Sequence, residues 1–360
     1  MIIGLVASPF VEVPPRRYGG TELFIANLAI GLKTLGHQVV VYANGESNLP
    51  VEVRSLYPQS LWPLTGDYSE TLTDINHAAW AIRDAAEICD VIHVNSLHGL
   101  PPSRFCRTPF VYTIHHDHHQ ALSDFYSYHP EVHFVTVSHF QQRLEEMPCL
   151  KTIHHGIDLS LYQVCEKKQQ YLSFLGRIAP FKGTHLAIEV AKKCGIPLKI
   201  AGEVQPLFQD YFDREVKPHI DGKFIEFVGE VDLEAKNELL GGSLALLFPI
   251  EWNEPFGLVM IEAMACGTPV LALPGGAVPE VVRDGVSGYV CRSLDEMADY
   301  ACEIQTLVRP ATVRKYAETH FTVERMAADY LRLYSHACET ESPQVFKGTA
   351  GPEGPTATAA

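Results

Sequence analysis

The sequence predicts an α/β protein of two domains, each built on a parallel sheet, that face each other across a cleft. The chain has 360 residues, which suits two domains of roughly 150 residues each. Short apolar runs alternate with helical patterns, as in βαβ units whose parallel sheets are covered on both faces. The alternation forms two series, and the polar stretch CEKKQQ separates them within residues 160–170. Two Rossmann-like domains are therefore expected.

The first series predicts an N-terminal domain over residues 1–162. A helix is expected at Thr21–Leu35, because Gly36 follows it as a helix stop. Strands are expected at Ile2–Ala7, Gln38–Ala43, Val91–Asn95, Phe110–Ile114 and Phe134–Val137.

The second series predicts a C-terminal domain over residues 170–320. Ligands of open α/β sheets bind beyond the carboxyl ends of the strands, so two facing sheets place the site in the cleft between domains. Residues 341–360 are rich in Pro, Gly, Thr and Ala and predict a disordered tail. Strands are expected at Tyr171–Leu175, Leu198–Ala201, Phe224–Val228, Leu244–Phe248 and Val270–Leu273, and helices at Thr184–Lys193 and Leu258–Cys266.

Charge and cysteine content argue against several classes of protein. The net charge is −15, which argues against nucleic acid as a partner and against strong attraction to anionic lipid. The nine cysteines form no C-x-x-C pair, so neither a disulfide framework nor a zinc knuckle is indicated. The N-terminus lacks signal-peptide features, and no apolar run reaches 18 residues. We expect a cytoplasmic protein without an integral membrane segment.

Two glycine-containing turns are candidate anion sites. Gly19 and Gly20 follow the first strand and open a helix, where glycine lets a ligand approach the backbone and the helix start offers free N–H groups. Gly176 and Arg177, followed by Lys182, come directly after a strand, and both cations suit a phosphate. A tight turn and solvated surface charges are the respective structural alternatives.

The segment FPIEWNEPFGLVMIEAMACGTPV is the most informative. Its helix is apolar except at Glu262, and an ionised carboxylate in such a helix is costly unless it is hydrogen-bonded. Vicinal sugar hydroxyls are suitable donors, and a second carboxylate, Glu254, precedes the helix. One carboxylate would hold a sugar and the other a ribose. The structural alternative places Glu262 in a buried ion pair and Glu254 in a helix cap.

The same segment also predicts a second anion cradle. The N–H groups of Gly257, Leu258 and Val259 lie at the expected helix start and have no helical partners. Phe256 stands between the cradle and Glu254, so we include it in the expected site.

A histidine cluster follows the strand that ends at Ile114. His115, His116, His118 and His119 with Asp117 have metal-ligand chemistry, but successive loop residues do not converge easily and no H-E-x-x-H is present. We expect one histidine to face the cleft and no metal to be bound. The chain also lacks a D-x-D for Mg²⁺, so Arg, Lys and helix starts would neutralise leaving-group charge.

These motifs together resemble the retaining GT-B glycosyltransferases of family four, once called group 1. The resemblance runs from about residue 1 to about 338 and rests on YGGTE, TIHH, HHGID and FLGRIAPFKG in the family's order. Its most specific part is the E-x7-E motif, present as Glu254 and Glu262. The resemblance implies that Arg177 and Lys182 contact the donor diphosphate, that Glu262 binds the nucleotide ribose, and that Glu254 holds the donor sugar.

The resemblance also implies roles in the first domain. His115 matches the histidine that meets the donor sugar, although His116 sits where relatives often carry Asp or Gly. Gly20 matches a glycine whose backbone lies against the diphosphate or acceptor. The pattern FTVERMAADYLRLY, within residues 321–338, is similar to the helix that crosses back to the first domain in this fold.

The predicted activity is retaining transfer of a hexose from a nucleotide-diphosphate sugar, UDP-glucose-like or GDP-mannose-like, to an acceptor hydroxyl. No metal or other cofactor is expected, and the acceptor is expected to be a small molecule, a glycan or a lipid-linked molecule. In the front-face route that the resemblance implies, Arg177, Lys182 and the helix start at Gly257 stabilise the departing diphosphate. The alternatives are a nucleotide-sugar epimerase on the same scaffold and a non-catalytic nucleotide-sugar-binding protein.

Overall fold

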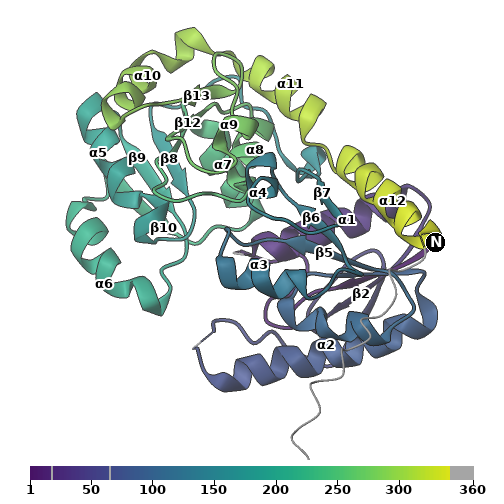
Figure 1. The fold of residues 1–360 in the computed structure, drawn as a ribbon. Helices are drawn as coiled ribbons and strands as arrows, with labels where there is room; N and C mark the ends of the chain where they lie inside the picture. Colours follow the sequence, from purple (N-terminus) through teal and green to yellow (C-terminus); the bar gives the residue numbers. More distant parts are fainter. Residues whose placement is uncertain (18, 65, 341–360) are drawn as a thin grey trace, which may run out of the picture.

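The computed structural model describes residues 1–17, 19–64 and 66–340, so the predicted tail at 341–360 lies outside the described residues. The first domain is built on a parallel sheet of order β3-β2-β1-β4-β5-β6-β7 (Figure 1). Its strands are β1 (Ile2–Val6), β2 (Gln38–Ala43), β3 (Glu52–Ser55), β4 (Val91–Val94), β5 (Phe110–Ile114), β6 (His133–Thr136) and β7 (Leu150–Thr152).

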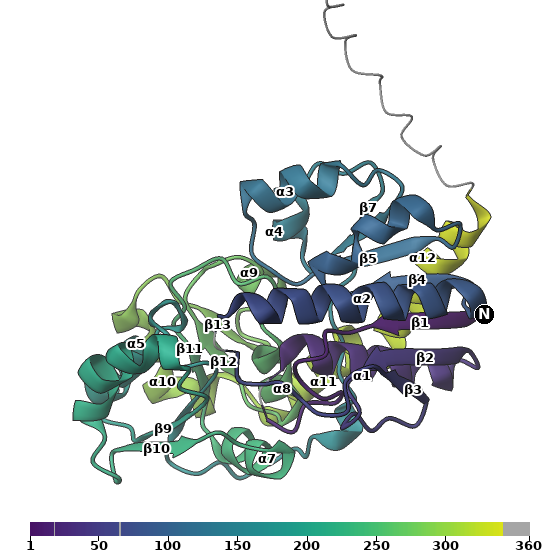
Figure 2. The same cartoon turned by 90° about the horizontal axis from the view of Figure 1, so that it is seen from below.

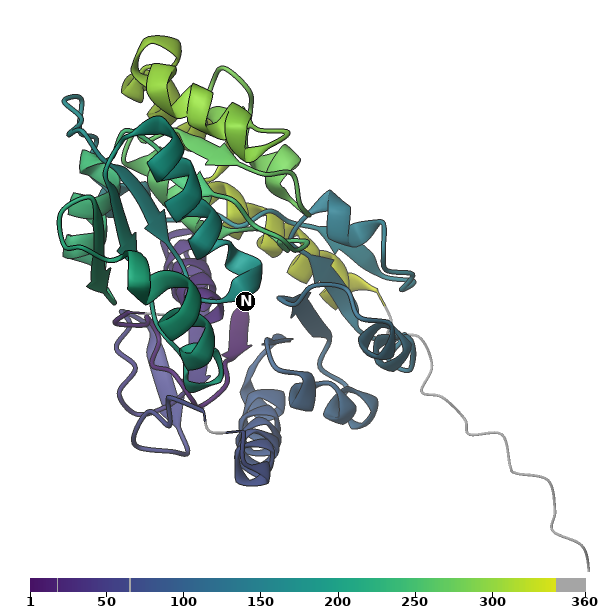
Figure 3. The ribbon, with the colours of Figure 1, turned by 90° about the vertical axis from the view of Figure 1, so that its left-hand side faces the viewer.

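The second domain is built on a parallel sheet of order β10-β9-β8-β11-β12-β13. Figure 3 shows this domain, coloured teal to green, above the purple and blue first domain. The prediction of two facing parallel-sheet domains is confirmed. The strands are β8 (Leu172–Leu175), β9 (Leu198–Ala201), β10 (Ile225–Gly229), β11 (Leu246–Phe248), β12 (Val270–Ala272) and β13 (Gly288–Val290).

Helices cover both faces of each sheet. In the first domain, α1 (Gly20–Thr34) and α12 (Val323–Glu339) pack on one face, and α2 (Tyr68–Ile88) and α3 (Gln120–Ser127) pack on the other (Figure 2). The remaining helices are α4 (His139–Gln142), α5 (Thr184–Cys194), α6 (Gln209–Tyr211), α7 (Leu233–Gly242), α8 (Leu258–Ala265), α9 (Val278–Val281), α10 (Leu294–Leu307) and α11 (Pro310–His320).

Helix α12 belongs to the core of the first domain although it comes last in the sequence. Its residues Met326 and Tyr330 are fully buried against α1 and the first sheet. Tyr330 Oη lies 2.8 Å from Thr113 Oγ1, and Tyr334 Oη lies 2.7 Å from His93 Nδ1. The chain therefore crosses between the domains twice, first after β7 and again between α11 and α12.

The expected elements are present with ends that differ by one or two residues. The largest omission is α2, which has 21 residues and was not predicted. Its buried face carries Asp74, His77 and several alanines, so the apolar period is weak. None of the helices that the structure describes combines the length and apolar character needed to cross a bilayer.

Candidate active site

A pocket of about 710 Å³ lies between the two domains. The first domain lines it from the loop after β1 and the start of α1, and the second domain lines it from the ends of β8 and β9, from α7 and from α8. This is the expected position at the carboxyl ends of both sheets. The lining includes Pro14, Pro15, Gly19, Gly20, Asn27, Tyr162, Leu175, Gly176, Glu203, Lys236, Leu258 and Glu262.

Two helix starts meet at this pocket. Gly19 precedes α1 with φ 151° and Gly257 precedes α8 with φ 84°, and neither helix has a side-chain cap. A Cβ placed on Gly20 would lie only 3.7 Å from the Leu258 side chain, so the two helix starts approach each other across the domain boundary. The free N–H groups of both first turns favour an anion between them.

Glu254 forms a buried ion pair with Lys182. Its Oε2 lies 2.6 Å from Lys182 Nζ and accepts a hydrogen bond of 3.0 Å from Trp252 Nε1. Lys182 Nζ also lies 4.4 Å above the Trp252 ring, within cation–π range. The predicted sugar-binding carboxylate and the predicted phosphate-binding lysine are thus one network. Glu254 does not cap α8, so the helix-cap alternative is wrong.

Glu262 forms a second buried ion pair, with Lys236 of α7. Its Oε1 lies 2.6 Å from Lys236 Nζ and accepts a 2.9 Å hydrogen bond from Tyr162 Oη. The ion-pair alternative therefore holds in the ligand-free protein. Glu262 also lines the pocket, and both of these hydrogen bonds reach the same oxygen. Within the described residues, no hydrogen bond to Oε2 is present.

Glycine positions fix the loop that carries Arg177 and Lys182. Gly183 has φ 74°, and a Cβ there would lie 1.9 Å from the Pro249 carbonyl oxygen. Only glycine fits this contact, which brings Lys182, at the end of the short 3₁₀ helix 180–182, next to the Glu254 loop. Gly176 lines the pocket, and Arg177 follows it directly as a partly buried residue.

His115 lies at the carboxyl end of β5 as a neutral side chain. Burial, with His155 and His116 nearby, lowers the pKa of His115 well below its ordinary value. Its Nε2 donates to Asn95 Oδ1 at 3.0 Å, which leaves Nδ1 as the hydrogen-bond acceptor. Phe24 packs edge-on against its ring at 5.0 Å.

The other histidines of the cluster do not converge with His115. His118 Nδ1 lies 3.2 Å from Glu145, and His119 precedes α3. The His116 carbonyl accepts from the Gln141 amide at 2.6 Å. These residues therefore act as separate loop contacts in the structure. Whether the protein needs a metal stays a prediction.

Several residues of the site were not predicted from the sequence. Lys236, Tyr162 and Trp252 hold the two carboxylates, and His155 packs 4.9 Å from Phe256, which is itself buried. Lys236, Tyr162 and His155 lie outside the motif that contains the two glutamates, so spacing alone gives no signal for them. Trp252 lies inside that segment, two residues before Glu254, and its position beside the carboxylate was an available signal.

Glu22 is a further unpredicted group beside the pocket. It lies in the first turn of α1, and its Oε2 would be 3.0 Å from a Cβ on Gly19. Burial raises the pKa of Glu22 to about 7. The sequence did contain a signal for Glu22, because it is the glutamate of the YGGTE motif. A glutamate so close to two glycines at a helix start is an unusual residue to find buried.

Comparison with known proteins decides the family. A family model described as Glycosyltransferase Family 4 matches residues 18–161, and one described as Glycosyl transferases group 1 matches residues 163–317. The chain belongs to the group 1 glycosyltransferases. The family resemblance of the sequence motifs is therefore confirmed.

Solved structures show the GT-B fold of this glycosyltransferase family. The crystal structure of AviGT4, a glycosyltransferase involved in avilamycin A biosynthesis, is 25% identical with a TM-score of 0.71, covering 94% of this chain and 98% of that one. Anabaena HepE in complex with UDP and glucose is 20% identical with a TM-score of 0.73, covering 93% and 100%.

Curated relatives match more locally. D-inositol 3-phosphate glycosyltransferase of Mycobacterium sp. (strain KMS) is 29% identical over 223 residues, covering 54% of this chain and 51% of the relative. Glycogen synthase of Mycobacterium tuberculosis (strain H37Rv) is 29% identical over 190 residues, covering 50% and 45%. The chain thus spans about half the length of the curated relatives it matches.

Proposed function

We propose that this protein is a retaining, metal-independent hexosyltransferase that uses a nucleotide-diphosphate sugar. The observation that carries the proposal is the pair of buried carboxylates, Glu254 and Glu262, each held by a lysine beside the helix start at Gly257. Two carboxylates and an anion cradle match the three parts of the donor: its sugar, its ribose and its diphosphate.

In the proposed reaction the glycosidic C–O bond breaks and negative charge grows on the leaving diphosphate. Lys182, Arg177 and the free N–H groups at the start of α8 stabilise that charge in a site that is already arranged for it. The start of α1 at Gly19 and Gly20 adds a second positive helix end. These groups supply the neutralisation that a metal gives in other transferases.

Glu254 takes the donor sugar and Glu262 the ribose in this proposal. Glu254 is 7% exposed and already accepts from Lys182 and Trp252, so sugar hydroxyls would add to an ordered carboxylate. Glu262 offers its Oε2 to the ribose hydroxyls. Neutral His115 presents Nδ1 as an acceptor for a sugar hydroxyl. The acceptor attacks from the face that the diphosphate leaves, so the anomeric configuration is retained and no enzyme nucleophile is required.

The names of relatives support the proposed donor and acceptor classes. HepE was solved with UDP-glucose, and relatives are named for inositol phosphate and glycogen. We propose a UDP-glucose-like or GDP-mannose-like donor and an acceptor hydroxyl on a small molecule, a glycan or a lipid-linked molecule. The nine cysteines are all free in the structure, which supports a reducing compartment, and we propose the cytoplasm.

A thermal-shift panel of UDP, GDP, ADP and their sugars, in the presence of EDTA, tests the donor site. A ligand at 100 times its Kd stabilises the folded state by about 2.7 kcal/mol. One nucleotide family should give a clear shift that Glu262→Gln reduces. Nucleoside diphosphate release that depends on an added acceptor then separates transfer from epimerisation. Absence of any shift would contradict the proposed donor site, and binding without release across a broad acceptor set would favour the non-catalytic alternative.

A further inference from the structure

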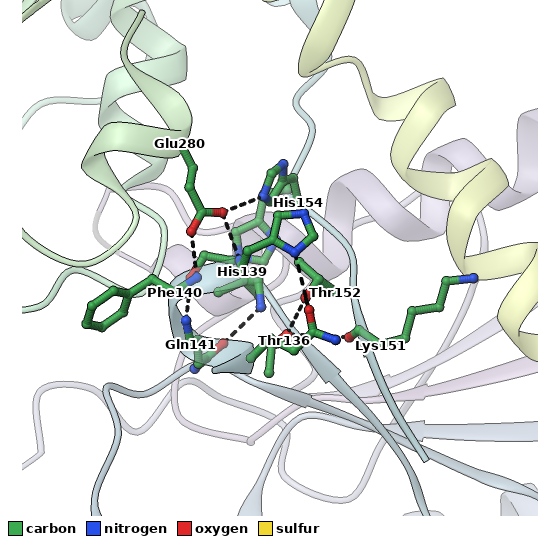
Figure 4. Close-up of polar contacts among 12 residues, drawn as sticks. Thr136, His139, Phe140, Gln141, Lys151, Thr152, His154 and Glu280 are labelled. Atoms are coloured by element: carbon green, nitrogen blue, oxygen red, sulfur yellow. Dashed lines mark hydrogen bonds and ion pairs between the residues drawn. The ribbon is translucent and has the colours of Figure 1, made fainter. Parts of the chain in front are cut away.

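Three metal-ligating side chains converge outside the residues that line the donor pocket (Figure 4). They are His139 at the start of α4, His154 in the loop after β7, and Glu280 on α9. One ligand atom of each lies within 4.8 Å of the other two, and no other such group of three occurs in the part of the chain that the structure describes. The two histidines come from the first domain and the glutamate from the second.

The separation of two of these atoms already suits a metal ion. Glu280 Oε2 lies 3.1 Å from His154 Nε2. Two ligands about 2.0–2.1 Å from a tetrahedral Zn²⁺ are roughly 3.3 Å apart. An ion can therefore replace the proton between these atoms with little movement. His139 is exposed, and its ligand atom already lies within 4.8 Å of those of His154 and Glu280, so it supplies the third ligand after a small closing movement.

Hydrogen bonds around the group orient two of its members as metal ligands require. The Glu280 carboxylate accepts from the backbone N–H of His139 at 2.8 Å and from that of Phe140 at 2.5 Å. His139 Nδ1 donates to Gln142 Oε1 at 3.2 Å, so the Nε2 of His139 keeps its lone pair for a metal. Thr152 Oγ1 donates to the same Gln142 oxygen at 2.8 Å and holds the amide in place.

A cavity of about 280 Å³ adjoins the group, and His139, His154 and Glu280 all line it. That space admits a water molecule as a fourth ligand. Two imidazoles and one carboxylate with an open fourth position form a donor set typical of Zn²⁺ and related divalent ions, rather than of Mg²⁺ or Ca²⁺.

We propose that His139, His154 and Glu280 bind a zinc-class divalent cation that ties the two domains together. The ion takes no part in sugar transfer. Its effect reaches the donor site through α9, because the Ala277 N–H donates to the Glu254 carbonyl at 2.8 Å. His154 also packs 5.8 Å from Phe256, in the loop that follows Glu254. Binding of the ion therefore stabilises one arrangement of the domains and of the Glu254 loop.

The test is calorimetric titration of the metal-free full chain with Zn²⁺, repeated on His139→Ala, His154→Ala and the control His320→Ala. His320 lines the same cavity but lies outside the ligand group. The wild type and His320→Ala should bind one ion tightly, and each of the other two variants should bind it at least tenfold more weakly. Because His139 is exposed, the His139→Ala variant should fold as the wild type does, and circular dichroism checks this.

Free cysteines also bind Zn²⁺, so the same titration is repeated with Co²⁺, whose thiolate complexes show a charge-transfer band. Binding by the proposed group should give no such band in the wild type. The proposal is overturned if the wild type binds no ion tightly, if His139→Ala and His154→Ala bind as the wild type does, or if the tight site shows thiolate ligation. Zn²⁺ should also raise the unfolding temperature of the wild type more than that of His139→Ala.

Discussion

The two carboxylates of the site are held alike but placed differently. Glu254 and Glu262 each lie 2.6 Å from a lysine nitrogen and are almost fully buried. Glu254 stands in a loop with Trp252, before α8, whereas Glu262 stands inside α8 and contacts Tyr162 from the linker between the domains. The comparison shows that one short motif places one carboxylate in a loop and the other inside a helix. In the proposed function the loop carboxylate contacts the reacting sugar and the helix carboxylate anchors the nucleotide.

The largest expected effect is the loss of activity when the loop carboxylate, Glu254, is replaced. Glu254→Gln removes the charge that orders Lys182 and the proposed sugar contact, so kcat should fall about 10²- to 10³-fold. The Kd for the nucleoside diphosphate should change less than about threefold, because Lys182 keeps its charge beside Trp252 and the proposed ribose contact at Glu262 is unchanged. Steady-state kinetics and calorimetry measure the two effects. Glu251→Gln, at an exposed carboxylate three residues earlier, is the matched control. A large loss of nucleotide affinity in Glu254→Gln would contradict the assignment.

The second effect concerns stability at the helix carboxylate. Lys236→Met keeps the volume but leaves Glu262 without its cation, and breaking a buried pair costs about 3 kcal/mol at the lower end of its range. We expect that reduction in the free energy of unfolding by urea titration. The lower end applies because Tyr162 still donates to the carboxylate. A change below about 0.5 kcal/mol would mean that solvent screens the pair.

The third effect tests which nucleotide group Glu262 contacts. Glu262→Gln should weaken nucleotide binding about 10- to 100-fold, as expected when a hydrogen bond to a charged group is lost. Comparison with deoxyribose analogues forms a double-mutant cycle. The wild type should discriminate against the deoxy form and the variant should not. If both proteins discriminate equally against the deoxy form, Glu262 does not contact the ribose.

A fourth effect, spread over several pH units, comes from buried histidines rather than from the charged pairs. Burial lowers the pKa of His93 and of His155 to about 3. The unfolded chain binds protons near pH 6.5, so stability is complete above that pH and falls as the pH drops toward 3, by about 1.4 kcal/mol per unit for each histidine. His155→Phe removes one such group, and denaturation between pH 6 and pH 4 should show a shallower slope. An unchanged slope would assign the pH dependence to other groups.

The sequence predicts many parts of the fold that have a strong apolar period, although α10 was missed despite its regular buried face, and it misses several parts that lack such a period. The central strands and α1, α5 and α8 are placed within two residues. Helix α2 is missed because Asp74 and His77 occupy its buried face. The edge strands β3 and β7 are missed because few of their residues are buried.

The site shows the same division. Glycines, cations and carboxylates within one motif are readable because their spacing is local. Lys236 and Tyr162 lie 26 and 100 residues from Glu262, and only the fold brings them together. His139, His154 and Glu280 likewise come from three separate segments, so their spacing in the sequence gives no sign of a metal site. The histidine-rich loop after β5 was considered as a metal site because its histidines are adjacent in the sequence.

The position of α12 has a consequence for how the chain matures on the ribosome. All strands of the second domain precede residue 291, but the first domain buries Met326, Tyr330 and Tyr334 of α12 in its core. The second domain can therefore complete its sheet during synthesis. The first domain waits until α12 emerges, and until then α1 alone covers the face that the two helices share. The domain that is made first is the domain that finishes last, and during that interval its exposed apolar face is a target for chaperones.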